Sequence, residues 1–493
     1  MSRIISRVQT NYAAKNEAFP YQAQAFLTLR DLDYSAIFHE QGLGKTKIAI
    51  DLLLYWLQKR DIDTVMIVTK KQLVKNWQDE FEVHTHIKPK VLSNNKKDNF
   101  YVLNSPVKVI ITNFETLSTD KDRIGLFLKC RNVAIIIDEA TKLKNPDAKL
   151  TQDFFDLAPL FKIRTIMTGT PVANRPYDIW AQVFFLDQGK SLGTDFKEFK
   201  ATTNLRNDFE ENIEARTEFE DAVSGIYSKI TDFSVRETKK SCAIDLPQKR
   251  YETVYAEPEA KQLEMYEKVL KELEIEVKQG GETILDDDSA ALKRLLRLNQ
   301  VASNPMLIDE GYCEKSGKEL VLEKLLAEIN HRGEKCIVWS NFIENINYFC
   351  KRFKEYNPRK IHGALSIEER NKSVDVFKKD DNCRVLFATP QAAKEGLTLT
   401  VANNVIFYDR GFNLDDYLQA QDRIHRISQK KTCYIYNLML ENSIDLWIDK
   451  LLEAKQYAAF LAQGDISVEE YKVRADYTYG ELIREILSSE EEI

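Results

Sequence analysis

Length, composition and charge are those of a multidomain globular chain. The 493 residues are enough for about two to four domains, and hydrophobic and charged fractions of 43% and 30% are ordinary. No run approaches the roughly 20 apolar residues that cross a bilayer, and the N-terminus lacks the apolar segment of a signal peptide. We therefore expect a cytoplasmic protein, nuclear if the source is eukaryotic, with no membrane partner.

Cysteine spacing and net charge narrow the class further. The seven cysteines form no CxxC pair, which argues against a zinc site or a disulfide framework and fits a reducing compartment. A net charge of −7 argues mildly against a dedicated nucleic-acid binder, because such proteins are usually basic. The charge is uneven, however, and a groove can be basic while the exterior is not.

The first part of the chain predicts a parallel sheet. Short apolar runs alternate with helical patterns, an order typical of βαβ units. The runs are apolar throughout, as expected when helices cover both faces of the sheet. The expected strands are residues 35–39, 64–69, 107–112, 133–138 and 165–168.

A phosphate-binding loop follows the first of these strands. Its strand–loop–helix context is the one that confirms this motif. Glycines let backbone N–H groups approach phosphate oxygens, Lys45 reaches the β- and γ-phosphates of ATP, and Thr46 holds Mg²⁺. The full pattern has Gly or Ala where this chain has His39. The predicted nucleotide-binding residues of the loop are Gly42, Leu43, Gly44, Lys45 and Thr46.

Two adjacent carboxylates end the fourth expected strand. Asp138 can bind Mg²⁺, and Glu139 can polarise the attacking water. Alone, the pair also fits an acidic helix N-cap after a strand. With Lys45 and Thr46 upstream, it favours a catalytic site that hydrolyses ATP.

Two weaker signals belong to the same half of the chain. Thr168, Gly169 and Thr170 follow the next strand, where small hydroxyl side chains can sense the nucleotide and pass its state to a nucleic-acid surface. Gln22 precedes the first strand, and its amide can both donate to and accept from an adenine edge. Alone, the first signal is a turn, and the second equally fits a solvent-facing glutamine at a helix start.

The second part of the chain begins with helical patterns and ends with another parallel sheet. Residues 186–246 are helical and polar, Leu246-Pro247 is a boundary, and a helix over 257–278 precedes a loop at 279–288. The expected strands are residues 335–340, 360–361, 383–388, 404–408 and 433–438. A last helix over 443–462 leads into a helix-prone tail.

Polar groups gather at the strand ends of this second sheet, where open parallel sheets bind ligands. Gly396 permits close backbone approach to a phosphate. Arg423 and Arg426 lie three residues apart in an expected helix over 419–429, and so on one face. Arginine stays charged and binds phosphate bidentately. Two phosphate-seeking groups far apart in the chain suggest one active site divided between two lobes, although the helix also fits an ordinary solvated face.

Several motifs follow one another in a fixed order along the chain: Gly42–Thr46, Asp138-Glu-Ala, Leu143-Lys-Asn145, Thr168-Gly-Thr-Pro171, the 298–305 stretch LNQVASNP, Ser316-Gly-Lys318 and Gln419–Gln429. In this order they resemble the Snf2-type ATPases of helicase superfamily 2, over about residues 19–455. The form is similar to the branch with annealing helicases and short bacterial or viral members, so we expect a bacterial or viral source.

Four departures from that family pattern stand out. Thr141 replaces the histidine of the DEAH-like box. Ala393-Lys394 stands where many members have Gly-Gly, and Thr398 stands where they have Asn. Ser428 replaces a glycine. A coupling role for position 141 is therefore in doubt.

The resemblance implies an α/β fold with two tandem RecA-like domains, helical protrusions between them and a helical C-terminal tail. The expected ranges are 1–186 for the ATP-binding lobe 1, 187–316 for the protrusions and linker, 317–455 for lobe 2, and 456–493 for the tail. ATP and Mg²⁺ are the implied cofactors, held in the cleft between the lobes.

The resemblance also assigns roles to residues. Lobe 1 contributes Gln22, Gly42 to Thr46, Asp138 and Glu139, and lobe 2 contributes Arg423, Arg426 and Gln419. Arg426 is the expected arginine finger and Arg423 its neighbour, since such a finger stabilises the charge of the transition state. The nucleic-acid grip consists mostly of phosphate contacts. Its candidates, besides Thr168 to Thr170 and Gly396, are Lys70, Lys71, Thr112 and Thr389.

The main functional hypothesis is a DNA-stimulated ATPase that translocates on duplex DNA and remodels DNA or protein–DNA complexes. A strand-separating or reannealing helicase is the alternative within the enzyme class. A regulatory protein that uses ATP as a switch is the alternative outside it, although it would need a broken hydrolysis set. DNA is the expected partner, with a recruiting protein as a second, and the oligomeric state stays open.

Overall fold

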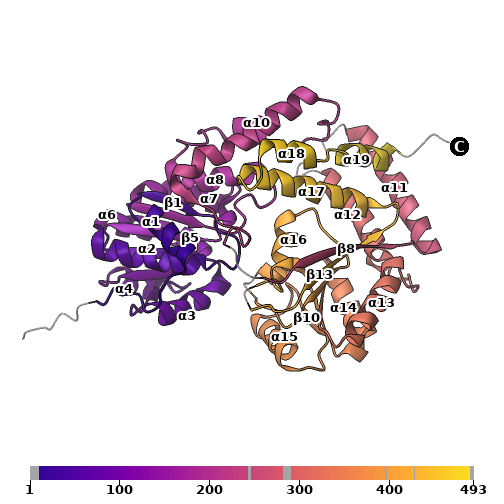
Figure 1. The fold of residues 1–493 in the computed structure, drawn as a ribbon, viewed down its shortest axis with the longest axis horizontal. Helices are drawn as coiled ribbons and strands as arrows, with labels where there is room; N and C mark the ends of the chain where they lie inside the picture. Colours follow the sequence, from indigo (N-terminus) through magenta and orange to yellow (C-terminus); the bar gives the residue numbers. More distant parts are fainter. Residues whose placement is uncertain (1–9, 243–245, 281–289, 395–396, 427, 489–493) are drawn as a thin grey trace, which may run out of the picture. The chain divides into compact units, whose positions relative to one another are not determined.

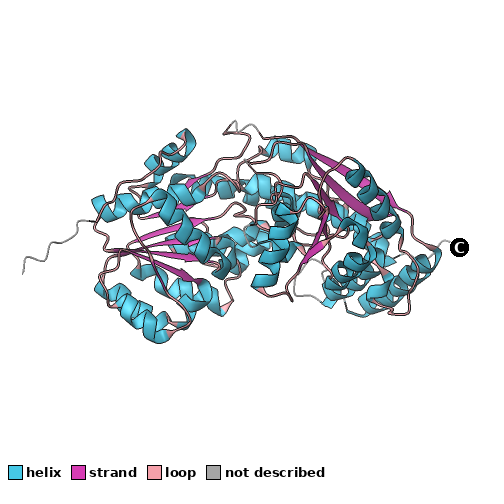
Figure 2. Ribbon diagram, turned by 90° about the horizontal axis from the view of Figure 1, so that it is seen from below, coloured by secondary structure: helices cyan, strands magenta, loops and turns pink. Residues whose placement is uncertain are grey.

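The computed structural model describes residues 10–242, 246–280, 290–394, 397–426 and 428–488. The chain forms two compact units. Unit 1 comprises residues 1–203, 222–244 and 462–464, and unit 2 comprises residues 204–221, 245–461 and 465–493. Each unit contains one parallel β-sheet with helices on its faces (Figures 1 and 2).

The sheet of unit 1 has the strand order β3-β4-β2-β5-β6-β1-β7, and all its neighbouring strands are parallel. Its four central strands carry fully or almost fully buried side chains, because helices cover both faces. The strands are β1 (Tyr34–Ile37), β2 (Thr64–Thr69), β3 (Lys90–Val91), β4 (Val109–Asn113), β5 (Val133–Asp138), β6 (Ile163–Met167) and β7 (Ser234–Val235).

Helices connect these strands and enclose an aliphatic core around the α-helix that follows β1, with Trp56 and Phe81 fully buried. The α-helices are α1 (Pro20–Leu29), α2 (Lys45–Lys59), α3 (Val74–His84), α4 (Lys96–Leu103), α5 (Phe114–Thr119), α6 (Lys121–Cys130), α7 (Lys149–Leu157), α8 (Trp180–Asp187) and α9 (Phe196–Thr203). The 3-10 helices are η1 (Lys71–Leu73), η2 (Ala140–Leu143), η3 (Ala158–Leu160), η4 (Pro176–Ile179) and η5 (Thr231–Phe233).

The sheet of unit 2 has the order β10-β11-β9-β12-β13-β8 and is also parallel throughout. Side chains alternate between its faces, so Ile337 and Trp339 pack in one core while Cys336 and Val338 pack in another. The strands are β8 (Lys249–Ala256), β9 (Cys336–Trp339), β10 (Arg359–Ile361), β11 (Val385–Ala388), β12 (Asn404–Phe407) and β13 (Cys433–Leu440).

The helices of the second half flank this sheet or pack beside it. The α-helices are α11 (Ala260–Gly280), α12 (Ala290–Ser303), α13 (Gly317–His331), α14 (Ile343–Arg352), α15 (Ile367–Lys379), α16 (Leu414–Gln421), α17 (Ile444–Ala462), α18 (Val468–Arg474) and α19 (Tyr479–Ser488). The 3-10 helices are η6 (Pro305–Leu307), η7 (Lys354–Tyr356) and η8 (Pro390–Lys394).

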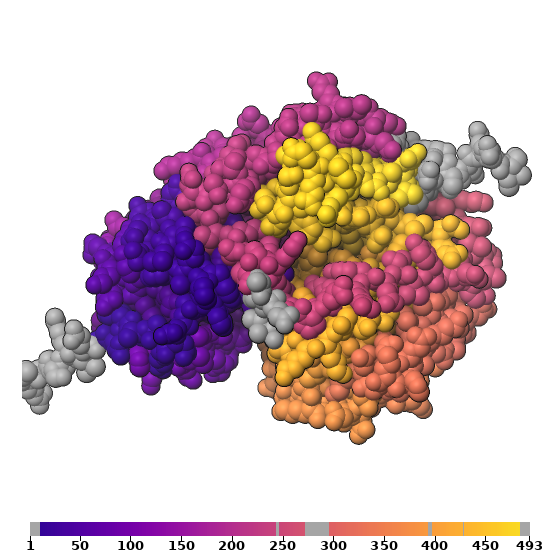
Figure 3. All heavy atoms as spheres, in the orientation of Figure 1, coloured from indigo at the N-terminus to yellow at the C-terminus, as the bar shows by residue number. Residues whose placement is uncertain are grey.

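One helix, α10 (Ile213–Ile230), contributes its first half to unit 2 and its second half to unit 1. Within unit 2 the C-terminal tail binds this first half and the segment before it. The Tyr477 hydroxyl donates to Glu220 at 2.9 Å, and the Tyr479 hydroxyl donates to the carbonyl of Arg206 at 2.7 Å. In Figure 3 the yellow tail accordingly lies against the magenta segment. The tail is thus a packed part of the fold.

The predicted fold class is confirmed, with two parallel-sheet α/β domains and helical segments outside them. All ten expected strands are present within two residues of their predicted ends. Three strands were not predicted, namely β3, β7 and β8. Among the described residues, no helix combines the length and the apolar character needed to traverse a membrane.

Candidate nucleotide-binding site

The phosphate-binding loop joins β1 to α2, as predicted. Gly42 and Gly44 have φ angles of 92° and 68°, in the left-handed region that favours glycine. A Cβ atom at Gly44 would also lie 2.4 Å from Gln22 Nε2, so a side chain there would displace the Gln22 amide. The loop therefore leads into the N-terminus of α2 through two glycines in the left-handed region, and the N–H groups of a helix N-terminus are suited to phosphate oxygens.

Gln22 lies directly against this loop. Its Nε2 donates to the carbonyl of Leu43 at 3.2 Å, and its Oε1 accepts from the backbone N–H of Phe19 at 3.0 Å. The side chain is 4% exposed. Sequence reasoning placed Gln22 at the site, and the structure shows that its amide also braces the loop and caps α1.

Lys45 opens α2, and its Nζ donates to the carbonyl of His39 at 2.9 Å. Burial lowers the pKa of the Lys45 amino group, while the nearby carboxylates of Glu139 and Asp138 oppose that shift. Thr46 follows in the first turn of the same helix. Both residues predicted to bind phosphate and Mg²⁺ thus lie at the carboxyl end of β1.

The acidic pair ends β5, two strands away in the sheet. Asp138 Oδ2 accepts from Trp77 Nε1 at 2.9 Å and from the Thr69 hydroxyl at 3.1 Å. Burial and the neighbouring charge of Glu139 raise the pKa of Asp138 to about 6, against these two hydrogen bonds and Lys45. Glu139 itself has a φ angle of 57°. A non-glycine residue in this region is strained, and such strain is typical of functional sites.

The side chains and backbone groups of this site fit a nucleotide bound together with Mg²⁺. A hydroxyl at Thr46 and a carboxylate at Asp138 are oxygen ligands of the kind that Mg²⁺ prefers. The cation would relieve the electrostatic cost that raises the pKa of Asp138. The backbone cradle formed by Gly42 and Gly44 accounts for the phosphates.

Thr168 to Thr170 lie beside the phosphate-binding loop. A Cβ atom at Gly169 would be 3.2 Å from the backbone nitrogen of Gln41 and 3.3 Å from Lys45 Nζ. The Thr168 hydroxyl is buried and accepts from the backbone N–H of Thr170 at 3.2 Å. This motif therefore lies next to the nucleotide loop, with Thr168 buried and Thr170 partly exposed.

Three further residues at this loop were not predicted, namely Glu40, Arg236 and Lys239. Lys239 forms an ion pair with Glu40 at 3.3 Å, and Arg236 Nη1 donates to the carbonyl of Phe38 at 2.8 Å. They were missed because nearly 200 positions separate the partners and β7 is only two residues long. The weak signal that could have found them is the basic pair Lys239-Lys240 after the helical segment.

The expected helix over 419–429 is wrong beyond its first turn. α16 ends at Gln421, and Asp422 is its C-cap. Arg423 and Arg426 follow in a turn, so they do not share a helix face. Arg423 is fully buried, whereas Arg426 is partly exposed. Arg426 Nε donates to the carbonyl of Asp422 at 3.1 Å.

Contacts with other loops of unit 2 hold this turn: the carbonyl of Arg423 accepts from the backbone N–H of Leu399 at 2.9 Å, and Gln429 binds a neighbouring loop. Gln429 Nε2 donates to the carbonyls of Ala402 at 2.9 Å, Ile424 at 3.0 Å and Thr400 at 3.3 Å. These contacts join the turn to the loop at residues 400–402. Gln419 remains inside α16, buried, and its Nε2 donates to Asp415 Oδ1 at 2.7 Å.

Two of the departures from the family pattern now have partners. The Thr398 hydroxyl accepts from Arg426 Nη1 at 2.8 Å. The hydroxyls of Ser428 and Thr400 lie 2.9 Å apart. Both positions therefore stabilise the turn that carries Arg426. Thr141 is buried at the start of η2, and nothing in its surroundings explains the replacement.

The candidate nucleic-acid residues have different environments. Lys70 is partly exposed and Lys71 is exposed, at the end of β2. Thr112 lies inside β4 and is fully buried, so its side chain does not reach the surface. Thr389 follows β11 and lines a cavity of about 210 Å³ together with Asn341 and Arg370. Gly396 lies outside the described residues.

The Ser316-Gly-Lys318 motif connects several elements of unit 2. Ser316 caps α13, and its hydroxyl lies 2.8 Å from that of Tyr408. A Cβ atom at Gly317 would lie 1.9 Å from the carbonyl oxygen of Glu257, so only glycine fits.

Lys318 adds a buried ion pair to these connections. Its Nζ lies 2.5 Å from Asp445 Oδ2, and the two side chains are 0% and 4% exposed. The same Asp445 oxygen accepts from the backbone N–H of Leu440 at the end of β13. The pair therefore joins α13, β13 and the start of α17.

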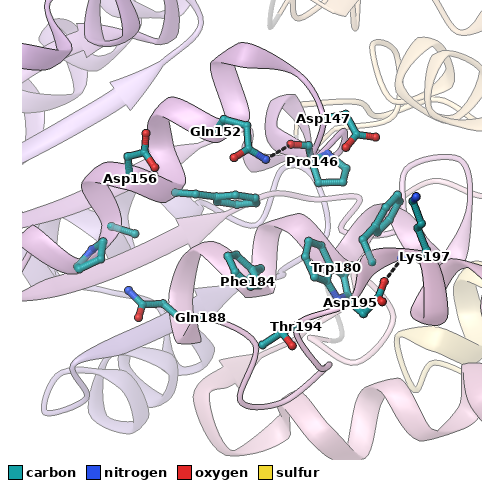
Figure 4. A pocket seen from close by; sticks show the side chains of 14 residues that line it. Pro146, Asp147, Gln152, Asp156, Trp180, Phe184, Gln188, Thr194, Asp195 and Lys197 are labelled. Carbon is teal, nitrogen blue, oxygen red and sulfur yellow. Dashed lines mark hydrogen bonds between the residues drawn. The ribbon is translucent and has the colours of Figure 1, made fainter.

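A wide groove of about 1010 Å³ in unit 1 lies apart from all these residues (Figure 4). Two of its three carboxylates already have partners. Asp156 pairs with Lys121 at 2.5 Å, and Asp195 accepts from the backbone N–H of Lys197 at 2.7 Å. Aromatic rings from α7, α8 and the start of α9 also line it: Phe155, Trp180, Phe184 and Phe196.

Asp138 provides a test of the electrostatics of the site. Because its folded-state pKa is raised, the penalty for ionising it is absent below about pH 4 and complete above about pH 6. Asp138→Asn keeps an acceptor for Trp77 and Thr69 without the charge. At pH 8 we expect the free energy of unfolding of the variant to exceed that of the wild type by up to about 3 kcal/mol. The variant should therefore unfold at a higher temperature.

The two proteins should melt alike near pH 4, which thermal denaturation at both pH values can check. A variant less stable than the wild type at pH 8 would contradict this account. ATP turnover should be lost in the same variant, because an amide is a poor replacement for a magnesium-binding carboxylate.

Comparison with known families gives a consistent result. Residues 27–307 match the SNF2-related domain, and residues 317–428 match the helicase conserved C-terminal domain. The ISWI chromatin-remodeling complex ATPase ISW2 of Saccharomyces cerevisiae is 27% identical over 461 residues, covering 88% of this chain and 39% of ISW2. The putative ATP-dependent helicase/translocase YwqA of Bacillus subtilis is 27% identical over 463 residues, covering 89% and 48%. The chain spans less than half the length of these relatives.

A solved structure is similar over nearly its whole length. The Sulfolobus solfataricus SWI2/SNF2 ATPase core in complex with dsDNA has 24% sequence identity and a TM-score of 0.42, covering 95% of this chain and 99% of that one. The family assignment depends on the sequence matches, which extend over both units. Since the SNF2-related domain alone covers more than half of the residues, the chain belongs to the Snf2-type ATPases of helicase superfamily 2, as its ordered motifs predicted.

Proposed function

We propose that this protein is a DNA-stimulated ATPase that translocates on duplex DNA and remodels DNA or protein–DNA complexes. One observation carries the proposal: the phosphate-binding loop, the acidic pair and the Thr168–Thr170 motif converge at the carboxyl ends of β1, β5 and β6. Ligands of open parallel sheets bind at this edge. A motif beside Lys45 can respond to the nucleotide and act on another surface.

In unit 1, the proposed hydrolysis uses groups with separate tasks. The backbone of Gly42 and Gly44 and the amino group of Lys45 bind the phosphates. Thr46 and Asp138 hold Mg²⁺, which neutralises phosphate charge when bound. Glu139 orients the attacking water and accepts its proton. No covalent intermediate with the protein is required, because positioning and electrostatics account for phosphoryl transfer.

Unit 2 contributes a cation that stabilises the transition state of ATP hydrolysis. Arg426 is partly exposed and is held through its Nε and Nη1 by Asp422 and Thr398. Arg423 is fully buried. This difference supports Arg426 as the residue that reaches the γ-phosphate and Arg423 as a neighbouring support.

The DNA grip is proposed to consist of contacts to phosphates, which require no sequence code. Lys71 supplies an exposed cation in unit 1, and Lys70 supplies a partly exposed one. Thr389 and Asn341 present polar groups at the strand ends of unit 2. Burial removes Thr112 from this set.

The decisive experiment measures ATP turnover without nucleic acid and with single-stranded DNA, duplex DNA and RNA. We expect duplex DNA to raise the rate most and Lys45→Ala to abolish the stimulated rate, since it removes the cation at the phosphates. Lys59→Ala is a matched control, because Lys59 is exposed at the far end of α2.

Turnover that no nucleic acid changes would refute the proposal and favour an ATP-switched regulatory protein. Displacement of a triplex strand without separation of a duplex supports translocation. Separation or reannealing of strands would support the helicase alternative.

A further inference from the structure

The segment that follows α10 runs beside the entry to the phosphate-binding loop. β7 pairs with β1 at the edge of the sheet. The pairing continues past both strands, because Phe38 N–H donates to the carbonyl of Val235 and Glu40 N–H donates to that of Glu237, each at 2.8 Å. The first residues of the loop are thus fixed by a chain segment almost 200 positions away.

Lys239 holds this entry through the side chain of Glu40. Its backbone N–H donates to Glu40 Oε2 at 2.8 Å, and its Nζ lies 3.3 Å from Glu40 Oε1. Both carboxylate oxygens are therefore bound by a single residue. Lys239 is 8% exposed, and its Cε lies 3.8 Å from where a Cβ atom of Gly42 would be. Its stem consequently lies beside the glycine turn, where Gly42 stays exposed.

Arg236 provides a second cation on the same side. Its Nη1 donates to the carbonyl of Phe38 at 2.8 Å. Arg236 and Lys239 are both close enough to Lys45 to contribute to lowering its pKa. Three cations from two distant parts of the sequence therefore surround one loop. A concentration of positive charge around a preformed loop favours anionic ligands.

We infer that Lys239 is a positioning residue of the nucleotide site, which orders the phosphate-binding loop through Glu40 and adds a cation to its electrostatic field. The inference rests on the proposed use of ATP. It extends that proposal to a residue outside the loop, the acidic pair and the Thr168–Thr170 motif. The phosphates themselves are still bound by the loop and Lys45.

The test is an equilibrium titration with a fluorescent ADP analogue and Mg²⁺, without DNA. Lys239→Ala should raise the dissociation constant about tenfold or more, since a hydrogen bond to a charged group contributes about 1.5–3 kcal/mol. Lys240→Ala is a matched control, because Lys240 is adjacent and exposed and carries the same charge. We expect it to bind the analogue like the wild type.

Two further variants separate positioning from a simple charge effect. Glu40→Gln should weaken binding as well, although it removes a negative charge that repels phosphate. Combined with Lys239→Ala, it should cost less than the sum of the single effects, because each variant breaks the same pair. Lys239→Arg should recover part of the affinity.

The outcomes distinguish the two proposals. A wild-type protein that does not bind the analogue would defeat the proposed ATPase function. Normal wild-type binding with unchanged affinity in Lys239→Ala would overturn only the positioning role. Equal losses in Lys239→Ala and Lys240→Ala would also overturn it. Loss of the thermal transition in both Lys239→Ala and Glu40→Gln would show that the pair is needed for folding instead.

Discussion

Arg426→Ala should retain ATP binding but lose turnover by about 10³–10⁵-fold, the range for arginine fingers in related phosphoryl transfers. The loss falls on the rate because the guanidinium acts on charge that develops only in the transition state. Thr398 and Asp422 hold the side chain in the wild type, so its geometry is set in advance. Single-turnover hydrolysis and equilibrium nucleotide binding should be measured on the same preparations.

A matched control for this variant is Arg384→Ala. Arg384 opens the opposite, amino end of β11, where its Nη1 donates to the carbonyl of Gly333 at 3.1 Å. We expect near-normal turnover. Thr398→Val should give a smaller loss than Arg426→Ala, since it removes only one support of the guanidinium. Weakened binding with a normal residual rate in Arg426→Ala would refute the finger role.

Lys318→Ala should destabilise unit 2 by about 3–5 kcal/mol, because it leaves the carboxylate of Asp445 buried without its counter-ion. Few single substitutions have so large an effect. Urea denaturation, followed by a signal from unit 2, measures the change. Lys324→Ala on the same helix is the control, since Lys324 is exposed and should cost little.

A double variant tests the electrostatic origin of that loss. Lys318→Met with Asp445→Asn removes both charges and keeps an acceptor for the Leu440 N–H. We expect it to recover most of the stability, because a neutral pair has no ion to desolvate. A double variant as unstable as Lys318→Ala would indicate packing as the cause.

The strands could be predicted where their side chains are apolar on both faces. β2 and β5 match their expected ranges residue for residue, because each is buried throughout. β8 was missed for the opposite reason: it lies at the sheet edge, and most of its side chains are exposed and polar. Without an apolar pattern, its pairing with β13 left no local signal.

The residues of the candidate site likewise fall into those that the sequence predicts and those that it does not. The phosphate-binding loop and the acidic pair could be found because their residues are neighbours in sequence. The end of α16 could not, since the turn after it is held by contacts of Gln429 with Ala402 and Thr400 in another loop. Lys239 could not either, because its partner Glu40 lies 199 residues away. Contacts between distant segments leave no periodicity in the sequence.

The position of β7 has a consequence for dissecting the protein. A fragment that stops after β6 and α8, near residue 187, omits β7 and leaves β1 as an unpaired sheet edge. The backbone donors of Phe38 and Glu40 would then lose their acceptors, and exposed edges of this kind promote aggregation. The shortest soluble nucleotide-binding fragment should therefore extend through residue 242, carrying the whole of α10 with it.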